Sequence, residues 1–230
     1  MKSTINYQNW VIYEDNHLII VNKPGNIPVQ SDISRDKSLI DYIKDYIKFK
    51  YDKPGNVFLG LPHRIDRPVS GIVILCKTSK SLSRVTKMFR ENKIKKIYWA
   101  IVENKINKRS GTLINYLKKN KRKNKSHCIN EEKKDYKRAE LNFLFKKELE
   151  NYFHYEIELI TGRHHQIRSQ LSYIGSCIKG DIKYGAKRTN KSGGINLHSR
   201  EVEFIHPIKK KLIKLVANTP NEIIWRTCTN

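Results

Sequence analysis

The strongest constraint on the fold is the stretch over residues 61–76, in which a polar loop runs directly into an apolar strand. Residues 72–76 are bulky, uncharged and largely β-branched, a pattern typical of a strand buried on both faces. Two prolines and a glycine come before this run, so residues 63–70 are predicted to form a loop. The sequence therefore places dense polar chemistry at the end of a core strand.

This loop carries one carboxylate, Asp66, between two guanidinium groups, Arg64 and Arg67. A lone aspartate among arginines is usually a structural ion pair. The alternative is a reactive carboxylate that its cationic neighbours keep ionised. The loop by itself fits both interpretations.

The charge of the chain indicates a polyanionic partner. The 230 residues include 46 Lys+Arg against 22 Asp+Glu, which gives a formal net charge of +24. Such an excess favours nucleic acid, because cations that neutralise phosphates release counterions and drive association. A lysine-rich genome would explain a mild bias, but it explains +24 poorly. At 38% hydrophobic residues, the chain still supports one substantial core, or two small lobes that share one.

No membrane or metal signal stands out in the sequence. The chain opens without a charged leader and apolar segment, and no apolar run approaches a membrane span, so we expect a soluble, cytoplasmic monomer with no membrane partner. The four cysteines lie far apart, form no Cys-x-x-Cys pair and do not match zinc spacing. In the cytoplasm they are expected to stay reduced.

Hydrophobic periodicity predicts a chain of mixed strands and helices. Ser38 and Asp41 form a capping-box signature at the start of one helical stripe. Strands are predicted over residues 10–13, 18–21, 72–76, 94–102, 138–145, 152–160, 196–205 and 212–217, and helices over 38–47, 79–91 and, as a short helix, 167–174.

Residues 104–138 differ from the rest of the chain, since they hold thirteen Lys/Arg and three Asp/Glu. Two interpretations stay open: a solvated, mobile insertion, or an arm that contacts phosphates. Strands are predicted on both sides, so this stretch is no domain boundary. We expect a single domain over residues 1–230, with 104–138 as a lysine-rich insertion within it.

A second polar cluster, at residues 161–168, follows directly on a predicted strand. The adjacent His164 and His165 do not share a helix face, and no His-x-x-x-His pair or glutamate partner is present, which argues against a metal site. A basic and polar cluster at a strand–helix junction suits anion binding instead. Residues 178–185, with two glycines, are interpreted as a structural loop.

Taken together, these segments resemble the RluA-type pseudouridine synthases. They occur in the family's order and span nearly the whole chain, and five in register are far more specific than one. The matching segments are residues 63–71 (His-Arg-Ile-Asp-Arg-Pro-Val-Ser-Gly), 96–102, 161–168 and 180–185, and Leu197-His198 with His206-Pro207, preceded by 11–15 and 21–24.

The resemblance implies an α+β fold with a mixed, largely antiparallel bent central sheet, flanking helices and a central RNA-binding cleft. It also implies that a uridine in structured RNA, ribosomal or transfer RNA, is converted to pseudouridine with no metal and no organic cofactor. Some relatives carry an N-terminal S4-like domain. Because the first predicted hairpin begins near Trp10, none is expected here.

By the same resemblance, Asp66 is the catalytic residue. Arg168 is expected to pair with Asp66 and to orient it through a charge-assisted hydrogen bond, and Tyr98 to stack on the target base. Three chemical routes stay open: the carboxylate attacks the sugar, supports a deprotonation that forms a glycal, or adds to the pyrimidine ring.

RNA contacts follow from the same comparison. The target atom cannot be reached inside a stacked helix, so the nucleotide must flip out, and Arg64 is a candidate to fill the vacated stack with its planar guanidinium. Arg67, Arg163 and His165 are expected to bind RNA.

Modest departures from the family pattern flank the reactive group and put target preference in doubt more than activity. Ile65 stands where Leu is usual, Pro68-Val69 where Asp-Thr is frequent, and His164 where Thr is common.

Two rival functions are compatible with parts of the sequence. One is a non-catalytic RNA-binding or ribosome-assembly protein on the same fold. The composition of the chain fits this function as well as it fits an enzyme. The other is a metal-dependent nuclease that uses His63, His164, His165 or Asp181, and the lack of ligand spacing argues against it.

Overall fold

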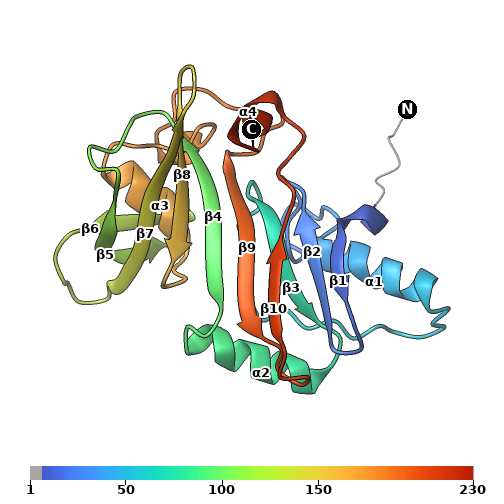
Figure 1. Ribbon diagram of the computed structural model, residues 1–230. Coiled ribbons are helices and arrows are strands. Elements are labelled where there is room, and N and C mark those ends of the chain that lie inside the picture. The colour runs from blue at the N-terminus through green and yellow to red at the C-terminus, as the bar shows by residue number, and fades with distance from the viewer. Residues whose placement is uncertain (1–6, 230) are drawn as a thin grey trace. The chain divides into compact units, whose positions relative to one another are not determined.

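The computed structural model describes residues 7–229; residues 1–6 and 230, the ends of the predicted 1–230 domain, lie outside the described residues. Its elements (Figure 1) fall into two compact units, and each is described by itself. The first unit comprises Met1–Ile94 with Val202–Asn218, and the second comprises Lys95–Glu201 with Thr219–Asn230. Among the described residues, no helix has the length and apolar character that crossing a membrane requires.

Antiparallel strands form the centre of the first unit. β1 (Val11–Glu14), which follows the 3-10 helix η1 (Tyr7–Trp10), pairs with β2 (Leu18–Lys23), and β2 pairs with β3 (Ser70–Cys76). The last strand of this unit, β10 (Leu212–Val216), pairs with β9 (Leu197–Ile205), whose residues are divided between the two units. Every residue of β3 is buried, as the apolar run predicts.

Two helices of the first unit begin at side-chain caps, and the cap at Ser38 was predicted. α1 (Leu39–Lys50) starts with a capping box, in which the Ser38 side chain accepts from the Asp41 backbone and the Asp41 carboxylate accepts from the Ser38 backbone. α2 (Ser79–Arg90) starts at Thr78, whose hydroxyl accepts from the Ser81 backbone at 3.1 Å. Each cap satisfies a backbone N–H that lacks a partner within its helix.

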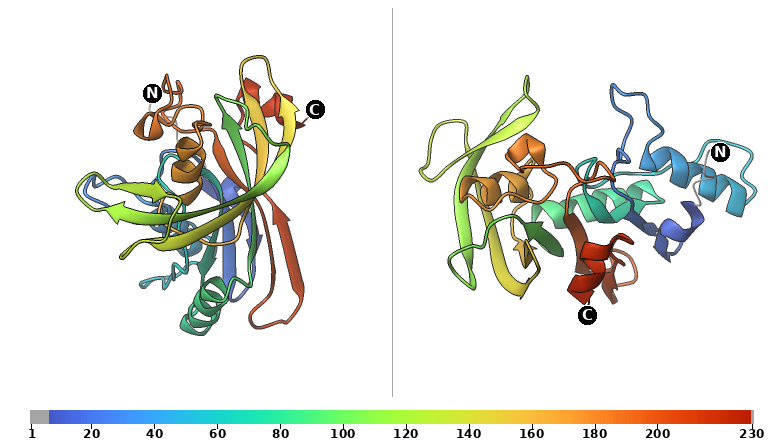
Figure 2. Two further views of the ribbon diagram at one scale, coloured as in Figure 1. Left: turned by 90° about the vertical axis from the view of Figure 1, so that its left-hand side faces the viewer. Right: turned by 90° about the horizontal axis from the view of Figure 1, so that it is seen from above.

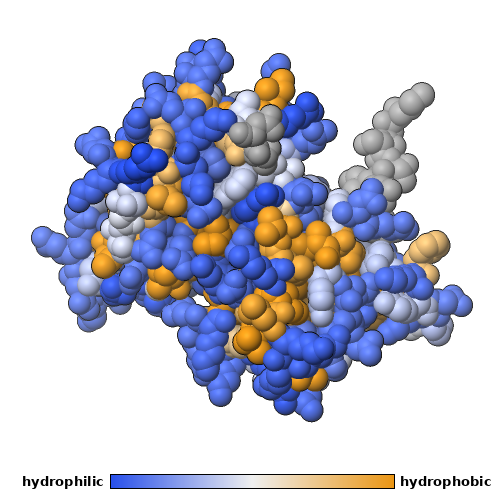
Figure 3. Space-filling view, viewed as in Figure 1, coloured by the Kyte–Doolittle hydropathy of each residue, from blue (hydrophilic) through white to orange (hydrophobic). Residues whose placement is uncertain are grey.

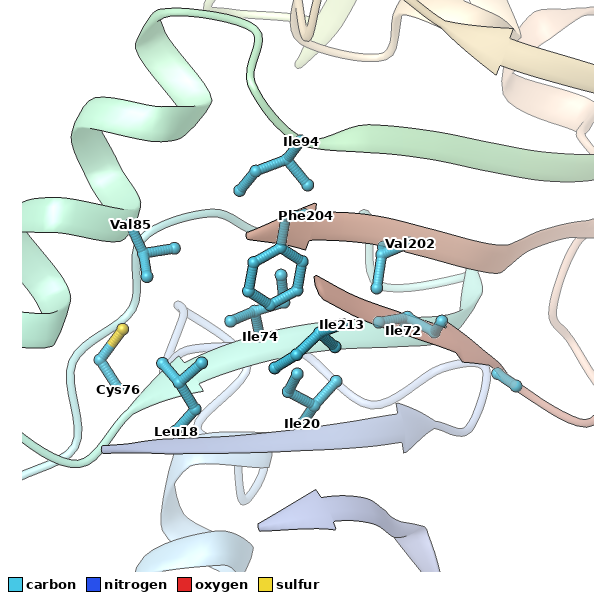
Figure 4. Close-up of a cluster of buried hydrophobic side chains, with 11 residues drawn as sticks. Leu18, Ile20, Ile72, Ile74, Cys76, Val85, Ile94, Val202, Phe204 and Ile213 are labelled. Atoms are coloured by element: carbon cyan, nitrogen blue, oxygen red, sulfur yellow. The ribbon is translucent and has the colours of Figure 1, made fainter. Parts of the chain in front are cut away.

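The core of the first unit lies against β2 and β3 (Figure 4). Alternate residues of each strand face the same side, so Leu18 and Ile20 meet Ile72 and Ile74 in one cluster. Burial of each such side chain contributes about 1.5–3 kcal/mol. The cluster is completed by Cys76, Val85, Ile94, Val202, Phe204, Ile213 and Ala217.

The second unit contains five antiparallel strands in the order β4-β8-β7-β5-β6. Helix α3 (Gln166–Tyr173) packs against β5 and β6 (Figure 2). The predicted α+β class with largely antiparallel strands is confirmed. The bounds are β4 (Lys95–Val102), β5 (Ser110–Asn120), β6 (Lys125–Ile129), β7 (Lys137–Glu148), β8 (Phe153–Leu159), the 3-10 helix η2 (Ile182–Tyr184) and α4 (Ile223–Thr229).

The lysine-rich stretch over residues 104–138 contains strands that the sequence did not predict. β5 and β6 form a hairpin in register from Tyr116 opposite Ile129 to Asn120 opposite Lys125. Leu117 and Cys128 are buried together with Ala139 of β7. Residues 110–129 of the stretch are thus a paired hairpin, with Lys118, Lys119 and Lys125 on its strands and Lys121 and Lys123 on the turn between them.

Candidate active site

The loop that carries Asp66 lies beside β3 in the first unit. Gly60 pairs with Cys76 through two backbone hydrogen bonds of 2.8 and 2.9 Å. Further along, the backbone N–H of Ile74 donates to His63 Nε2 at 2.8 Å. The N–H of Val69 donates to the carbonyl of Asp66 at 3.0 Å, which closes a turn. Backbone bonds and a histidine ring therefore position the loop, and leave the Asp66 side chain half-buried at its turn.

Lys23, at the end of β2, binds this loop through hydrogen bonds. Its side chain is completely buried, and Nζ donates to the carbonyl oxygens of Pro24, Ile27 and Arg67 at 2.8, 2.9 and 3.1 Å. Three acceptors match the three N–H donors of an ammonium group. Burial lowers the pKa of Lys23 to about 7, while the charge of Asp66 acts in the opposite direction. Lys23 thus joins the residue next to Asp66 to the end of a core strand.

The two arginines of the loop have different surroundings. The Arg67 guanidinium donates to the carbonyl of Asn26 at 3.1 Å, to Ser34 Oγ at 2.9 Å, and to the carboxylate of Asp36. Arg67 therefore fastens the loop to the preceding segment, a structural role alongside its predicted RNA contact. The side chain of Arg64 is exposed.

Tyr98 lies in the second unit, on β4. Its residue is opposite Ile157 of β8, and its side chain is 8% exposed. The neighbouring Trp99 points to the other face, where its ring meets the His154 ring edge-on at 4.7 Å. Strand alternation thus separates the two aromatic side chains, as the sequence predicts.

Arg168, on α3, forms a buried two-point ion pair with Asp181. Its Nε lies 2.6 Å from Asp181 Oδ2 and its Nη2 lies 2.8 Å from Oδ1, with the side chains 5% and 1% exposed. Such a fork fixes the plane of a guanidinium as well as its charge. The guanidinium carbon also lies 5.0 Å from the centre of the Tyr184 ring. The loop interpreted as merely structural therefore supplies the partner that orients Arg168.

His165 precedes α3 in the left-handed backbone conformation, with φ of 51°. Its Nδ1 lies 3.0 Å from the hydroxyl of Tyr184, and its ring stacks on His164 at 3.8 Å. Burial, reinforced by the charge of Arg168, lowers the pKa of His165 to about 2. This imidazole is therefore neutral at physiological pH.

The basic β5–β6 hairpin contacts the same residues. The backbone N–H of Ser126 donates to the Tyr184 hydroxyl at 2.7 Å, and Ser126 Oγ lies 2.9 Å from His164 Nδ1. Lys125 Nζ lies 4.8 Å from the centre of the Tyr184 ring, a cation–π distance. The hairpin is thus bound to the start of α3 and to η2, next to Arg168.

The predicted site residues fall into two groups. Asp66 shares one loop of the first unit with Arg64 and Arg67, whereas the second unit carries Tyr98, Arg163, His165 and Arg168. Arg163 is exposed and donates from Nε to the carbonyl of Arg138 at 2.9 Å. The pairing of Asp66 with Arg168 stays a prediction.

Sequence reasoning missed the roles of Lys23, Asp181 and Tyr184. A signal existed for each, because all three fall in segments that match the family. Among the described residues, no group of three or more His, Cys, Asp or Glu side chains could hold a metal ion.

Comparison with known proteins connects both units to one family. The family model described as RNA pseudouridylate synthase matches residues 17–173. A curated relative, "Ribosomal large subunit pseudouridine synthase C" of Buchnera aphidicola subsp. Acyrthosiphon pisum, is 35% identical over 100% of this chain and 73% of its own length. The protein of the same name from B. aphidicola subsp. Schizaphis graminum is 34% identical over 98% of this chain and 71% of its own length.

Solved structures share the fold. The human protein "RNA Pseudouridylate Synthase Domain Containing 4" matches with a TM-score of 0.79 at 20% identity, over 95% of this chain and 92% of that chain. The human "RNA Pseudouridylate Synthase Domain Containing 1" matches with a TM-score of 0.72 at 17% identity, over 95% and 86%. The predicted pseudouridine synthase fold is confirmed, and the chain belongs to the RluA-like family of RNA pseudouridine synthases, which are isomerases.

Proposed function

We propose that this protein converts a uridine of large-subunit ribosomal RNA to pseudouridine, with Asp66 as the catalytic residue. Ribosomal RNA is favoured over transfer RNA because the relative that covers the whole chain at 35% identity carries a ribosomal large-subunit name. The observation that carries the assignment of Asp66 is its support: a buried ammonium, Lys23, binds the carbonyl of the adjacent residue and two more carbonyls. A carboxylate at a fixed turn suits the chemistry better than one on a mobile loop.

Arg168 is the proposed partner of Asp66. A guanidinium has five N–H donors in a rigid fork, and Asp181 takes one from Nε and one from Nη2. Pairing with Asp66 would bring a second carboxylate to the same guanidinium. One guanidinium shared by two carboxylates would keep Asp66 ionised and would fix its direction.

Tyr98 and Arg64 are proposed to handle the displaced nucleotide. The target uridine leaves the stack, its uracil stacks on the Tyr98 ring, and Arg64 fills the gap with its planar guanidinium. During the reaction the glycosidic bond from N1 breaks and a bond from C5 to the same sugar carbon forms. The proton on C5 of the rotated ring must then leave, and the Tyr98 hydroxyl is proposed to assist that step.

The basic surface of the second unit is proposed to hold the RNA around that nucleotide. Arg163 and His165 precede α3, and the β5–β6 hairpin presents lysines beside them. These lysines would contact phosphates. His165 is neutral and would instead contribute hydrogen bonds and ring contacts. Binding should therefore weaken steeply with salt.

The test is to map pseudouridine in large-subunit ribosomal RNA and in transfer RNA after incubation with the purified protein. We expect modification of one or a few ribosomal sites, and no modification by Asp66→Asn or Asp66→Ala, with RNA binding retained within a few-fold. Asp52→Asn is a matched control, because Asp52 is exposed and lies outside the loop. Substantial turnover by either Asp66 variant would remove Asp66 from its role. Modification of transfer RNA alone would overturn the ribosomal target.

A second measurement tests Tyr98. Tyr98→Phe keeps the ring and removes the hydroxyl, so we expect RNA affinity to persist while the rate of product formation falls. A near-normal rate would leave the phenol hydroxyl without an essential task.

Undiminished activity in the presence of a chelator is expected as well, and loss of activity would instead support the metal-dependent alternative.

A further inference from the structure

A groove in the first unit lies apart from the residues discussed so far. It encloses about 580 Å³ between the C-terminal half of α2 and the turn that joins β9 to β10. Arg84, Lys87, Lys93 and Lys210 line it, together with one carboxylate, Glu91. Four cations against one carboxylate leave an excess of three positive charges around a single hollow.

The shape of the groove is built in by buried groups. His206 Nδ1 accepts from the backbone N–H groups of Ile208 and Lys209 at 3.1 and 2.8 Å, and Nε2 lies 3.0 Å from Asp15 Oδ2. Across the groove, the Arg84 guanidinium donates to the carbonyl of Pro207 at 3.0 Å. The two backbone bonds fix the turn and the Arg84 bond ties it to α2, while the buried His206 ring lies next to Asp15, just after β1, so the groove does not depend on exposed side chains alone.

Apolar side chains form the floor of the groove. Met88 of α2 lines it together with Ile205 and Pro207, and Ile205 is 49% exposed. Figure 3 shows hydrophilic side chains over α2 and the β9–β10 turn, at the lower edge of the view, with apolar atoms between them. An apolar floor with a cationic rim suits a ligand that has flat or apolar faces joined by phosphates, because ribose and bases pack on the floor and phosphates meet the rim.

The position of the groove relative to the proposed catalytic loop is set by β3. Asp66 lies before the first residue of β3, Ser70, and α2 follows its last residue, Cys76. Seven residues of extended strand separate these ends by roughly 20 Å. None of the groove's lining residues belongs to the loop over residues 61–70, although His63 of that loop stacks on Phe89 of α2 at 4.4 Å. The groove is thus a surface separate from Asp66 that the same structured RNA can reach.

We propose that this groove binds the sugar–phosphate backbone of the RNA substrate at a point remote from the target uridine. The inference rests on the proposed function, since it takes ribosomal RNA as the ligand. Glu91 moderates the site: it lies 2.8 Å from Lys93 and 3.7 Å from Lys87, so these two lysines share its charge when RNA is absent. Phosphates compete with Glu91 for the same ammonium groups.

The test compares two triple variants that remove equal charge. Lys87→Gln/Lys93→Gln/Lys210→Gln removes the groove lysines, and Lys44→Gln/Lys48→Gln/Lys53→Gln removes three lysines on and just after α1. Binding of a transcript of the large-subunit ribosomal RNA is measured over a range of salt, with thermal unfolding as the check on folding.

We expect the groove variant to weaken binding about tenfold or more at 0.1 M salt and to lower the salt slope by about 2, less than the full three contacts because Glu91 already shares two of the lysines. The α1 variant should change affinity less than about threefold. Equal losses in the two variants, or no loss in the groove variant, would overturn the proposal.

A single variant of opposite sign completes the test. Glu91→Gln releases Lys87 and Lys93 and should tighten RNA binding more than Asp45→Asn, which removes the partner of Lys37 on the α1 side. Weaker or equal binding would count against the groove. All these measurements are of affinity, so they do not depend on turnover. A failure of the proposed reaction would show separately as the absence of pseudouridine.

Discussion

Replacing Asp181 by Asn tests the buried ion pair that orients Arg168. The change keeps the shape of the side chain and one acceptor oxygen, but it removes the charge opposite a guanidinium that is 5% exposed. Loss of one partner of a buried ion pair costs about 3–5 kcal/mol, because the other charge stays buried without compensation. We expect the lower end of that range, since Asn still accepts one hydrogen bond.

Urea unfolding measures this loss. With a slope of about 2 kcal/mol per molar, a loss of about 3–4 kcal/mol lowers the midpoint by about 1.5–2 M. Asp45→Asn is the matched control, because Asp45 pairs with Lys37 and the two side chains are 47% and 45% exposed. An exposed pair of this kind contributes less than about 1 kcal/mol. The double variant Arg168→Met/Asp181→Leu should recover most of the stability, since apolar residues can replace a buried pair at little cost.

The same variants separate structure from chemistry. We expect the double variant to fold and yet to make no pseudouridine, because it lacks the guanidinium proposed to pair with Asp66. The reasoning fails if Asp181→Asn shifts the urea midpoint no more than Asp45→Asn does. It also fails if the double variant loses as much stability as the single variants Arg168→Met and Asp181→Leu combined. A fully active double variant would remove Arg168 from the proposed site.

Three more changes have defined outcomes. Lys23→Met removes the donor that three carbonyls share, so stability should fall by about 1–3 kcal/mol and kcat should drop with RNA affinity kept. Thermal unfolding and single-turnover rates decide, and an unchanged kcat contradicts a positioning role. Burial lowers the pKa of His154 to about 4, so between pH 6.5 and 4 the unfolded chain binds more protons than the folded chain. Stability therefore decreases as the pH is lowered, by up to about 3 kcal/mol. Urea midpoints of His154→Phe should lack this decrease, and a pH profile identical to that of the unmodified protein refutes the assignment. Gly180 has φ of +87° and an added Cβ would lie 2.6 Å from Asn190 Nδ2, so Gly180→Ala should cost about 1–3 kcal/mol, whereas Gly55→Ala, in open space, should cost little; equal thermal unfolding midpoints would show that the loop gives way.

The elements that local chemistry determines could be predicted from the sequence. The run at residues 72–76 forms the second half of β3, and the cap at Ser38 starts α1 within one residue. Both signals are contained in a few consecutive residues. The ends of most other elements differ from the prediction by one to three residues, where a strand's last pairs depend on its neighbour.

Elements whose burial comes from distant partners could not be predicted. β5 and β6 carry lysines on their outer positions and bury only a few residues, among them Leu117 and Cys128, so no apolar alternation is visible. Their burial depends on Ala139 of β7 and on α3, which lie far along the chain. The short helix α4 was missed as well, although its Trp225 is 1% exposed and lies beside His198.

The same distinction holds for the candidate site. Asp66, Tyr98 and Arg168 are readable because their segments match a family. Lys23 also falls in a matching segment, but its contacts are not readable, because its acceptors are backbone carbonyls up to 44 residues away. No side-chain pattern encodes a carbonyl partner.

The environment of His165 has a consequence for experiments on this protein. With its pKa at about 2, the imidazole stays uncharged at every acidity an assay would use. The proposed contact of His165 with RNA would then be indifferent to buffer pH and to added electrolyte, unlike the contacts proposed for the surrounding lysines. An acid limb in a rate profile would have to be assigned to another group.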